Sequence, residues 1–523
     1  MFPGGHLTVY FGTQTGTAES FAQQIEREGE QNGFKVKAVD LEDIEDDVSG
    51  GMLSAGTRDE SGNNKAIFLM STYGEGEPTD NAARFIQLLR QKSGMTGPNT
   101  DAGSDTEEEK KADQGDLLDP SYLNGLQYAV FGLGNKQYEF FNAMGKAADE
   151  GLEKVGATRI MELGVGDDDD DLEADFENWK DKLLWPTLKK KYAQTATLPS
   201  LPPTKSKLPP CNYQVEYITS NNTKPDQISI DQIHASCKHY FTAVDCPITL
   251  NRELRSPNDG GSTVHLEIDI SKTNGKVTYQ TADNLGVLPV NDNATVEAIA
   301  AALSLDLNAT FRLKAAPDKD SKHSALFPTP LTVRECLSRY CDITSAPRRS
   351  ELKLLAAYAK DPIDKNALLR MASKEGRAEY REKIIDAQIG LVDIVARLCR
   401  SIEMPLEHLI ALCPRLHPRY YTISSSSSSY PGSIHVTVAV TKFQRTDGST
   451  FKGVCSNYLA ETPLKNSVRV FCRDSTFRLP ADVSQDILTS LILFVCVIIL
   501  HFKLAKYRIR FIVFEISFLY QLL

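Results

Sequence analysis

Apolar segments and amphipathic helical patterns alternate along residues 7–185. The apolar runs are "LTVYFG", "AIFLMS" and "YAVFGLG", and the helical patterns lie near residues 17–31, 80–92, 142–155 and 173–184. Such alternation is typical of a parallel sheet, because each crossover between parallel strands places a helix over one face. The pattern therefore predicts a doubly wound α/β domain over residues 7–185.

Two polar stretches interrupt or end this pattern. Residues 93–115 are polar and acidic, and they predict a disordered surface insertion. Residues 186–210 are rich in lysine and proline, and they predict a semi-extended linker between two domains.

The pattern after the linker is mixed. Strand patterns occur in "STVHLEIDIS", "KVTYQTADNLGVLPV", "RYYTISSS", "SIHVTVAVTKF" and "VRVFC", while "NATVEAIAAALSL" and residues 351–412 have helical patterns. We expect a β-barrel over residues 233–483 with a helical insertion at about 290–412. The serine run Ser424–Ser429 follows a strand pattern and is expected to end it.

The last part of the sequence differs in character. Residues 487–500 are strongly apolar but short for a membrane span. Residues 508–523, which follow this run, lack turn signals and clean periodicity.

Charge and cysteine content narrow the possible functions. A formal net charge of -11 argues against nucleic-acid binding and suits a basic protein partner. The 10 cysteines begin at Cys211 and include no CxxC pair. This usage indicates a reducing compartment and predicts no metal site.

The segment Thr13–Ala18, "TQTGTA", follows the first strand pattern and opens a helix. Backbone amides at a helix start, with a glycine for the turn, bind an anion, and threonine hydroxyls add donors. The lysine that a nucleoside triphosphate loop needs is absent. The loop thus fits a single terminal phosphate, although a plain turn explains it equally well in isolation.

Two further loops favour the phosphate interpretation. "STYGEGEPTDNA" follows the second strand pattern and "GLGNKQYEFFNAMG" the third, so all three loops should meet at one edge of the sheet. Each of the two carries a tyrosine, Tyr73 and Tyr138, which could cover the faces of a flat ring. A phosphate beside a flat ring indicates FMN.

These segments resemble the flavodoxin-like FMN-binding domain of diflavin reductases, in particular of the NADPH–cytochrome P450 reductase family. The family usually has Ser at the position of Thr13, and it often has His at the position of Phe140. The resemblance implies that Tyr73 and Tyr138 sandwich the flavin. It implies an FMN site made of Thr13, Gln14, Thr15, Gly16, Thr17, Ala18, Ser71, Thr72, Tyr73, Gly74, Leu133, Gly134, Asn135, Lys136, Gln137, Tyr138, Glu139, Phe140, Phe141, Asn142 and Asp168.

An acidic run places eight carboxylates in Asp167–Glu177. Acids suit a helix N-terminus, so the run could simply be a solvated helix start. Concentrated negative charge also steers a basic partner. The resemblance implies that this patch docks a haem protein.

A second flavin site is implied by "RYYT" and "GVCS". An arginine beside a strand can hold a pyrophosphate, and helix N-terminal amides can add to it. These motifs resemble the FAD barrel of ferredoxin-reductase type in the same family. The resemblance implies FAD contacts from Arg419, Tyr420, Tyr421, Thr422, Thr437, Val438, Ala439, Phe443, Gly453, Val454, Cys455 and Ser456, with Thr422 at the catalytic position near the flavin and Arg252 reaching NADPH.

The resemblance implies an NADPH–haemoprotein reductase that passes electrons through FAD and FMN to cytochrome P450 and other haem proteins at the endoplasmic reticulum membrane. The family's N-terminal anchor and GPGTG-like nucleotide loop are not recognisable here. Residues 486–523 do not resemble the family, so we expect this apolar tail to lie outside the fold. Without the anchor and the nucleotide loop, we expect a truncated form that is cytoplasmic and has weakened NADPH turnover. The alternatives are a non-enzymatic FMN carrier or fragment, or another diflavin reductase such as a sulfite reductase flavoprotein.

Overall fold

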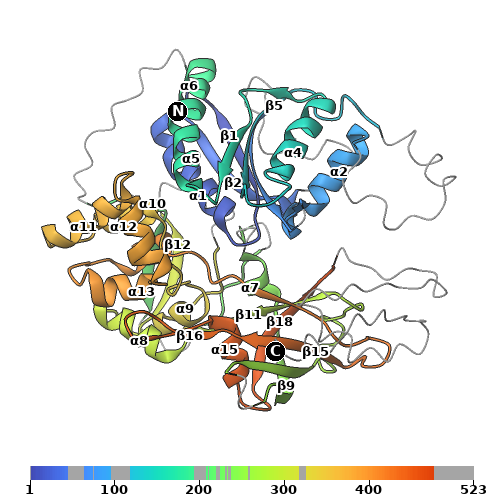
Figure 1. Ribbon diagram of the computed structural model, residues 1–523, viewed down its shortest axis with the longest axis vertical. Helices are drawn as coiled ribbons and strands as arrows, with labels where there is room; N and C mark the ends of the chain where they lie inside the picture. The colour runs from blue at the N-terminus through green and yellow to red at the C-terminus, as the bar shows by residue number, and fades with distance from the viewer. Residues whose placement is uncertain are drawn as a thin grey trace. The chain divides into compact units, whose positions relative to one another are not determined.

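The chain divides into two compact units, Met1–Lys205 and Ser206–Leu523. The computed structural model describes residues 2–44, 64–74, 76–95, 118–193, 208–209, 211–218, 224–229, 232–233, 237–256, 260–316 and 325–475 (Figure 1). Most of the predicted insertion 93–115 and the whole tail 486–523 lie outside these residues.

The first unit is built on a sheet with strand order β2-β1-β3-β5, continued by β7 and β6 beside β5. All of these strands pair in parallel, and only the short β4 is antiparallel to β3. The strands are β1 (His6–Gly12), β2 (Lys35–Asp40), β3 (Asn64–Tyr73), β4 (Glu77–Pro78), β5 (Leu126–Gly134), β6 (Thr158–Arg159) and β7 (Gly164–Asp167).

Helices cover both faces of this sheet, as Figure 1 shows. One apolar core joins the sheet to α1, α5 and α6, and the other joins it to α2 and α4. The bounds are α1 (Thr17–Gly29), α2 (Ala83–Ser93), α4 (Ala143–Lys154), α5 (Leu172–Trp179) and α6 (Trp185–Tyr192), with short helical turns η1 (Glu30–Asn32), η2 (Leu41–Asp43), η3 (Asp80–Ala82) and η4 (Lys180–Leu184). This confirms the predicted doubly wound, flavodoxin-like fold.

The second unit contains a six-stranded antiparallel sheet of order β14-β11-β18-β9-β10-β15. A bridge between Ile423 and Val436 joins its two ends, so the sheet closes into a barrel around an apolar core. The strands are β9 (Val244–Glu253), β10 (Ser262–Asp269), β11 (Asn284–Leu288), β14 (Arg419–Thr422), β15 (Ser433–Val440) and β18 (Ser467–Arg473).

A second, largely helical core accompanies the barrel. It also holds a small sheet of β8 (Tyr213–Ile218), β12 (Thr310–Ala315) and β13 (Leu331–Thr332), and β16 (Lys442–Gln444) pairs with β17 (Thr450–Lys452). The helices are α7 (His239–Thr242), α8 (Asn293–Ala302), α9 (Val333–Arg339), α10 (Arg349–Leu355), α11 (Pro362–Ala372), α12 (Arg377–Tyr380), α13 (Leu391–Asp393), α14 (Leu406–Leu412) and α15 (Val454–Glu461), with η7 (Arg381–Asp386) and η8 (Ile394–Leu398).

The structure differs from the sequence-based expectations in three places. Helix α6 reaches Tyr192, so the start of the predicted linker 186–210 is helical. Strand β8 lies before the predicted start of the barrel unit at residue 233 and pairs with β12 inside the predicted helical insertion. Residues 276–281 form an irregular loop and no strand, and the buried Tyr279 hydroxyl anchors this loop by a hydrogen bond with Ser425 Oγ at 2.9 Å.

Among the helices of the described residues, none combines the length and the apolar character needed to cross a membrane.

Candidate functional site

The predicted phosphate loop is a tight turn between β1 and α1. Gly16 is the N-cap of α1 and adopts a left-handed backbone conformation with φ 88°. Its amide donates to Thr13 Oγ1 at 3.0 Å, and no side chain caps the helix. A side chain at position 16 would be strained at this φ, whereas glycine adopts it freely. The helix start therefore presents backbone amides and threonine hydroxyls at one point, the arrangement an anion requires.

A buried polar chain fixes this loop from behind. Thr13 N–H donates to Asn81 Oδ1 at 2.9 Å, and Asn81 Nδ2 donates to Asp40 Oδ1 at 2.8 Å. Gln14 is tied to the same neighbouring loop through Asp80, with Nε2 to Oδ2 at 3.0 Å. The loop geometry is thus set by Asp40 at the end of β2 and by Asp80 and Asn81 in η3, which preorganises it for a ligand.

Asp40 should make this unit sensitive to pH. Burial raises the pKa of Asp40 to about 7, although hydrogen bonds from the Glu42 amide and Asn81 oppose the shift. A carboxyl whose folded-state pKa lies above its unfolded value of 3.8 loses stabilisation as pH rises through that interval, because the unfolded chain releases its proton first. We expect Asp40→Asn to remove this dependence and to gain about 2 kcal/mol relative to the original chain above pH 7.

Thermal unfolding of both proteins from pH 5 to pH 8 checks this prediction. The difference between them should grow with pH up to about 7 and then level off. A difference that stays constant with pH would contradict a raised pKa at Asp40.

The two predicted flavin tyrosines are unusually open to solvent. Tyr73 is 50% exposed and Tyr138 is 66% exposed. Their loops meet at the carboxyl edge of the sheet. Met144 N–H donates to Thr72 Oγ1 at 3.2 Å. Two large exposed rings beside a phosphate-type loop have the chemistry needed to cover a flat aromatic ligand.

Three of the predicted FMN residues have side chains that cannot face a ligand. Ala18 and Leu133 are packed in the apolar core. Asn142 is fully buried, adopts φ 55° at the start of α4, and donates its Nδ2 to the Gly166 carbonyl at 3.0 Å. These positions can contribute backbone groups only, and Asn142 holds β7 against the loop.

The acidic run has two kinds of carboxylate. Asp167 is buried and pairs with Lys136 Nζ at 3.2 Å, while Asp171 caps α5 through the Ala174 amide at 3.0 Å. Asp168, Asp169 and Asp170 are exposed. The Asp169 carboxylate accepts a hydrogen bond from Gln137, next to Tyr138. Part of the run therefore builds the helix start, and part forms a negative surface at the tyrosine loop.

The second candidate site is a cavity of about 470 Å³ in the barrel unit. Its volume lies within the range typical of cofactor pockets. The lining residues are Thr344, Ser345, Ala346, Gln388, Arg419, Tyr420, Tyr421, Ala439, Thr441, Phe451, Gly453, Val454, Cys455 and Ser456.

The start of α15 forms one wall of this cavity. Gly453 is its N-cap and no side chain caps the helix, so the first amides point out of the helix end. Gly453 N–H donates to the Thr441 carbonyl at 2.9 Å, and Thr441 N–H donates to Ser456 Oγ at 3.1 Å. With the exposed Arg419 beside it, this wall is positive and rigid, as a pyrophosphate site requires.

Aromatic side chains form another part of the cavity. Burial raises the pKa of Tyr421 well above its usual value. The side chains of Tyr421 and Cys455 are hydrogen-bonded to each other. Tyr420 packs edge-on against Phe471 with ring centroids 6.0 Å apart, and Arg473 lies 5.3 Å from its ring. Both tyrosines are therefore held in fixed positions where they can contact a ring.

Several predicted FAD residues do not line the cavity. Val438 is fully buried in the barrel core, and Thr437 lies beside it on β15. Phe443 stacks on the lining residue Phe451, with ring centroids 4.8 Å apart. The exposed Thr422 and Arg252 lie on β14 and β9, so their predicted roles near the flavin and NADPH stay predictions.

Other lining residues escaped the sequence analysis. Thr344–Ala346 and Gln388 come from the helical region, and Gln388 adopts φ 54°. Asp342 fixes this segment by accepting from the Ser345 amide at 3.0 Å. A polar loop with a positive-φ residue carries no specific signal in one sequence, so only the fold brings it to the site.

Comparisons with known proteins match this two-site architecture. Residues 9–179 match a flavodoxin family model, and residues 234–458 match an FAD binding domain. The NADPH–cytochrome P450 reductase of Cavia porcellus is 34% identical over 493 residues, covering 91% of this chain and 66% of that protein. The human protein of the same name is 33% identical over 501 residues (93% and 67%), and that of Drosophila melanogaster is 34% identical over 502 residues (93% and 66%).

The chain thus spans about two thirds of the length of these relatives. The identity extends over both units, and the flavodoxin match precedes the FAD-domain match. The chain belongs to the NADPH–cytochrome P450 reductase family.

Proposed function

We propose that this chain forms the two-flavin part of an NADPH–haemoprotein reductase. FAD would accept hydride from NADPH, and FMN would deliver single electrons to a haem protein such as cytochrome P450. The observation that carries the proposal is that an FMN-type loop cluster and an FAD-type cavity occur in one chain, with both domain models matching. The family resemblance supports a place at the cytoplasmic face of the endoplasmic reticulum membrane.

The residues of the first unit have complementary roles in this proposal. The turn at Gly16 and the hydroxyls of Thr13, Thr15 and Thr17 hold the FMN phosphate. Tyr73 and Tyr138 cover the ring and limit its contact with water, while their exposure leaves one edge open for electron exit.

The residues of the barrel unit hold the second flavin. Arg419 and the start of α15 bind the pyrophosphate, because both present donors to the same cavity wall. Tyr420 and Tyr421 position the ring system. Thr344–Ala346 and Gln388 close the cavity from the helical region.

The exposed Asp168, Asp169 and Asp170 would dock the haem protein. They lie beside the tyrosine loop, so a basic partner held there would approach the exposed flavin edge. Attraction of this kind speeds association and weakens with salt.

One experiment tests both the electron exit and the docking surface. The chain is loaded with FMN and FAD, its flavin content is measured after release, and it is reduced chemically before mixing with cytochrome c. Electron transfer should be fast at low ionic strength. The variant D169N/D170N should slow it about 3- to 10-fold, and the difference should vanish at high salt.

A control variant removes two charges elsewhere on the same unit. Glu150 and Glu153 lie on the later part of α4 and are exposed at their side chains, so E150Q/E153Q should leave the rate nearly unchanged. Equal effects of the two double variants would contradict docking at the acidic run. Failure to bind both flavins would contradict the proposed function itself, and a parallel assay with NADPH as the reductant tests hydride entry separately.

A further inference from the structure

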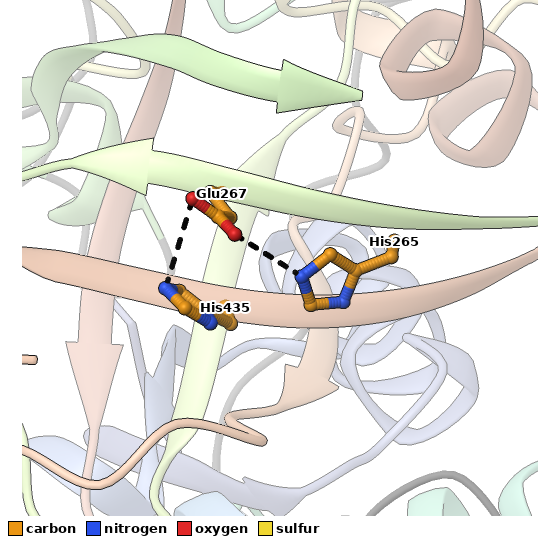
Figure 2. A group of neighbouring side chains, drawn as sticks. All are labelled: His265, Glu267 and His435. Atoms are coloured by element: carbon orange, nitrogen blue, oxygen red, sulfur yellow. Dashed lines mark ion pairs between the residues drawn. The ribbon is translucent and has the colours of Figure 1, made fainter. Parts of the chain in front are cut away.

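Three side chains of metal-ligand type lie close together on the neighbouring strands β10 and β15 of the barrel sheet. His265 and Glu267 lie on β10 and His435 lies on β15, and one ligand atom of each falls within 4.8 Å of the others. Figure 2 shows both imidazole rings directed toward the Glu267 carboxylate.

The strand register brings the three together. His265 and Glu267 are two residues apart, so they share one face of β10. Glu267 is directly paired with His435 across the β10–β15 ladder. The opposite face, with Val264 and Leu266, packs into the barrel core. Adjacent hydrogen-bonded strands hold the positions of all three Cα atoms, which makes the cluster a rigid scaffold.

The distances between the ligand atoms are slightly longer than in an occupied metal site, so a bound ion could draw the three side chains together. His265 Nε2 lies 3.6 Å from Glu267 Oε1, and His435 Nε2 lies 4.0 Å from Glu267 Oε2. In a tetrahedral zinc site with bonds of about 2.0–2.1 Å, neighbouring ligand atoms lie about 3.3 Å apart. Small side-chain rotations would reach that spacing without moving the strands.

The exposure of the three side chains also fits a metal site. His265 and His435 are 3% and 6% exposed at their side chains, whereas Glu267 is 32% exposed. The imidazoles are thus sheltered from water, while the carboxylate gives an ion a path of entry and leaves room for a water ligand. Two neutral imidazoles and one carboxylate with an open position form a common ligand set for Zn²⁺.

We infer that His265, Glu267 and His435 bind one divalent ion of the Zn²⁺ class and so link β10 to β15. Magnesium and calcium are poor candidates, because they prefer oxygen ligands to imidazole nitrogen. This departs from the sequence-based prediction of no metal site. The inference does not depend on the proposed function, although His265 is paired with Arg252 on one side and Thr437 on the other, both of which were predicted as cofactor contacts.

The alternative is an ion pair, in which a protonated histidine neutralises Glu267 and no metal ion is required. Both arrangements have the same side-chain geometry, so only a measurement of zinc binding can distinguish them. The full chain, treated with EDTA and dialysed, is titrated with Zn²⁺ against a competing chelator, and bound zinc is counted. The variant Glu267→Gln keeps the size of the side chain but removes the anionic ligand. The control is His6→Gln, which changes an exposed histidine at the start of β1 in the other unit.

We expect one tightly bound Zn²⁺ per original chain, retained in H6Q and weakened at least 10-fold in E267Q. Zinc-edge X-ray absorption should show two imidazole ligands, and zinc should raise the unfolding temperature of the original chain but not of E267Q. Circular dichroism verifies that E267Q is folded, and His435→Gln serves as a second variant. Equal zinc affinity in the original chain and in both cluster variants, a bound ion without imidazole ligands, or displacement of zinc by equimolar Mg²⁺ would each overturn the inference.

Discussion

Gly145→Ala is expected to destabilise the first unit by about 3 kcal/mol, because it inserts a methyl group where two backbones touch. A Cβ at position 145 would lie 2.7 Å from Gly132 Cα and 3.3 Å from Gly132 N. Both neighbours are backbone atoms, so relief requires a shift of α4 away from β5. The residues between these two glycines form the predicted flavin loop that carries Tyr138, and the shift would therefore disturb the FMN site as well.

Thermal unfolding and FMN titration measure these effects. For a domain of this size the loss corresponds to a decrease in the unfolding temperature of about 6–12 °C. FMN affinity should fall at the same time. FAD content should stay unchanged, because the cavity lies in the other unit.

The matched control is Gly151→Ala on the same helix. Its Cβ would lie 3.0 Å from Met95 Cε, the end of a flexible side chain, and 3.4 Å from Leu89. Because alanine also favours a helix by about 1 kcal/mol over glycine, this variant should be neutral or slightly stabilising. Equal losses from both substitutions would mean that the contact between Gly145 and Gly132 has no special role.

The parallel domain could be predicted because its signals are local. The central strand β5 is apolar except for Gln127 and is nearly fully buried, as parallel strands covered on both faces are. Strand β2 was not predicted, because half-buried positions alternate with exposed lysines in a short segment. The small sheet of β8, β12 and β13 was also missed, since its strands are short, half exposed and far apart in sequence.

The candidate sites divide in the same way. Thr13–Ala18 and Gly453–Ser456 could be found because each is a contiguous turn at a helix start. Thr344–Ala346 and Gln388 could not, because only the tertiary fold brings them to the cavity. Within the predicted motifs, Asn142 and Val438 proved to be structural, since a motif match does not reveal which side chains face inward.

Residues 276–281 show why a predicted strand can be wrong. Val277 and Tyr279 are buried and alternate with more exposed neighbours, which resembles a half-buried strand. The segment is nevertheless an irregular loop, and the Tyr279 hydroxyl anchors it by donating to the Ser433 carbonyl at 3.0 Å. The alternation of buried and exposed residues thus comes from the packing of a loop. Sequence periodicity alone cannot distinguish such a loop from a half-buried strand.

The cavity of the barrel unit, which we propose as the FAD site, provides the prediction with the largest expected effect on binding. Arg419→Glu should weaken FAD binding at least about 100-fold, equivalent to about 2.7 kcal/mol or more. The exposed guanidinium of Arg419 donates to the His417 carbonyl at 2.8 Å, which fixes it at the cavity wall beside the uncapped start of α15. A carboxylate at this position would repel a pyrophosphate instead of binding it. Arg419→Lys keeps the charge but loses the planar fork, so it should cause an intermediate loss.

Flavin content after purification, followed by titration with FAD, measures this effect in each variant. FMN bound to the first unit is the internal control, and it should remain at the level of the original chain. The unfolding temperature of the flavin-free protein should change little, because the Arg419 side chain is exposed and its removal leaves no cavity in the apolar core. Retention of FAD by R419E would show that the pyrophosphate lies elsewhere and that the start of α15 is only a structural turn. Loss of both flavins would point instead to a general folding defect, so the selective loss of FAD is the result that supports the assignment.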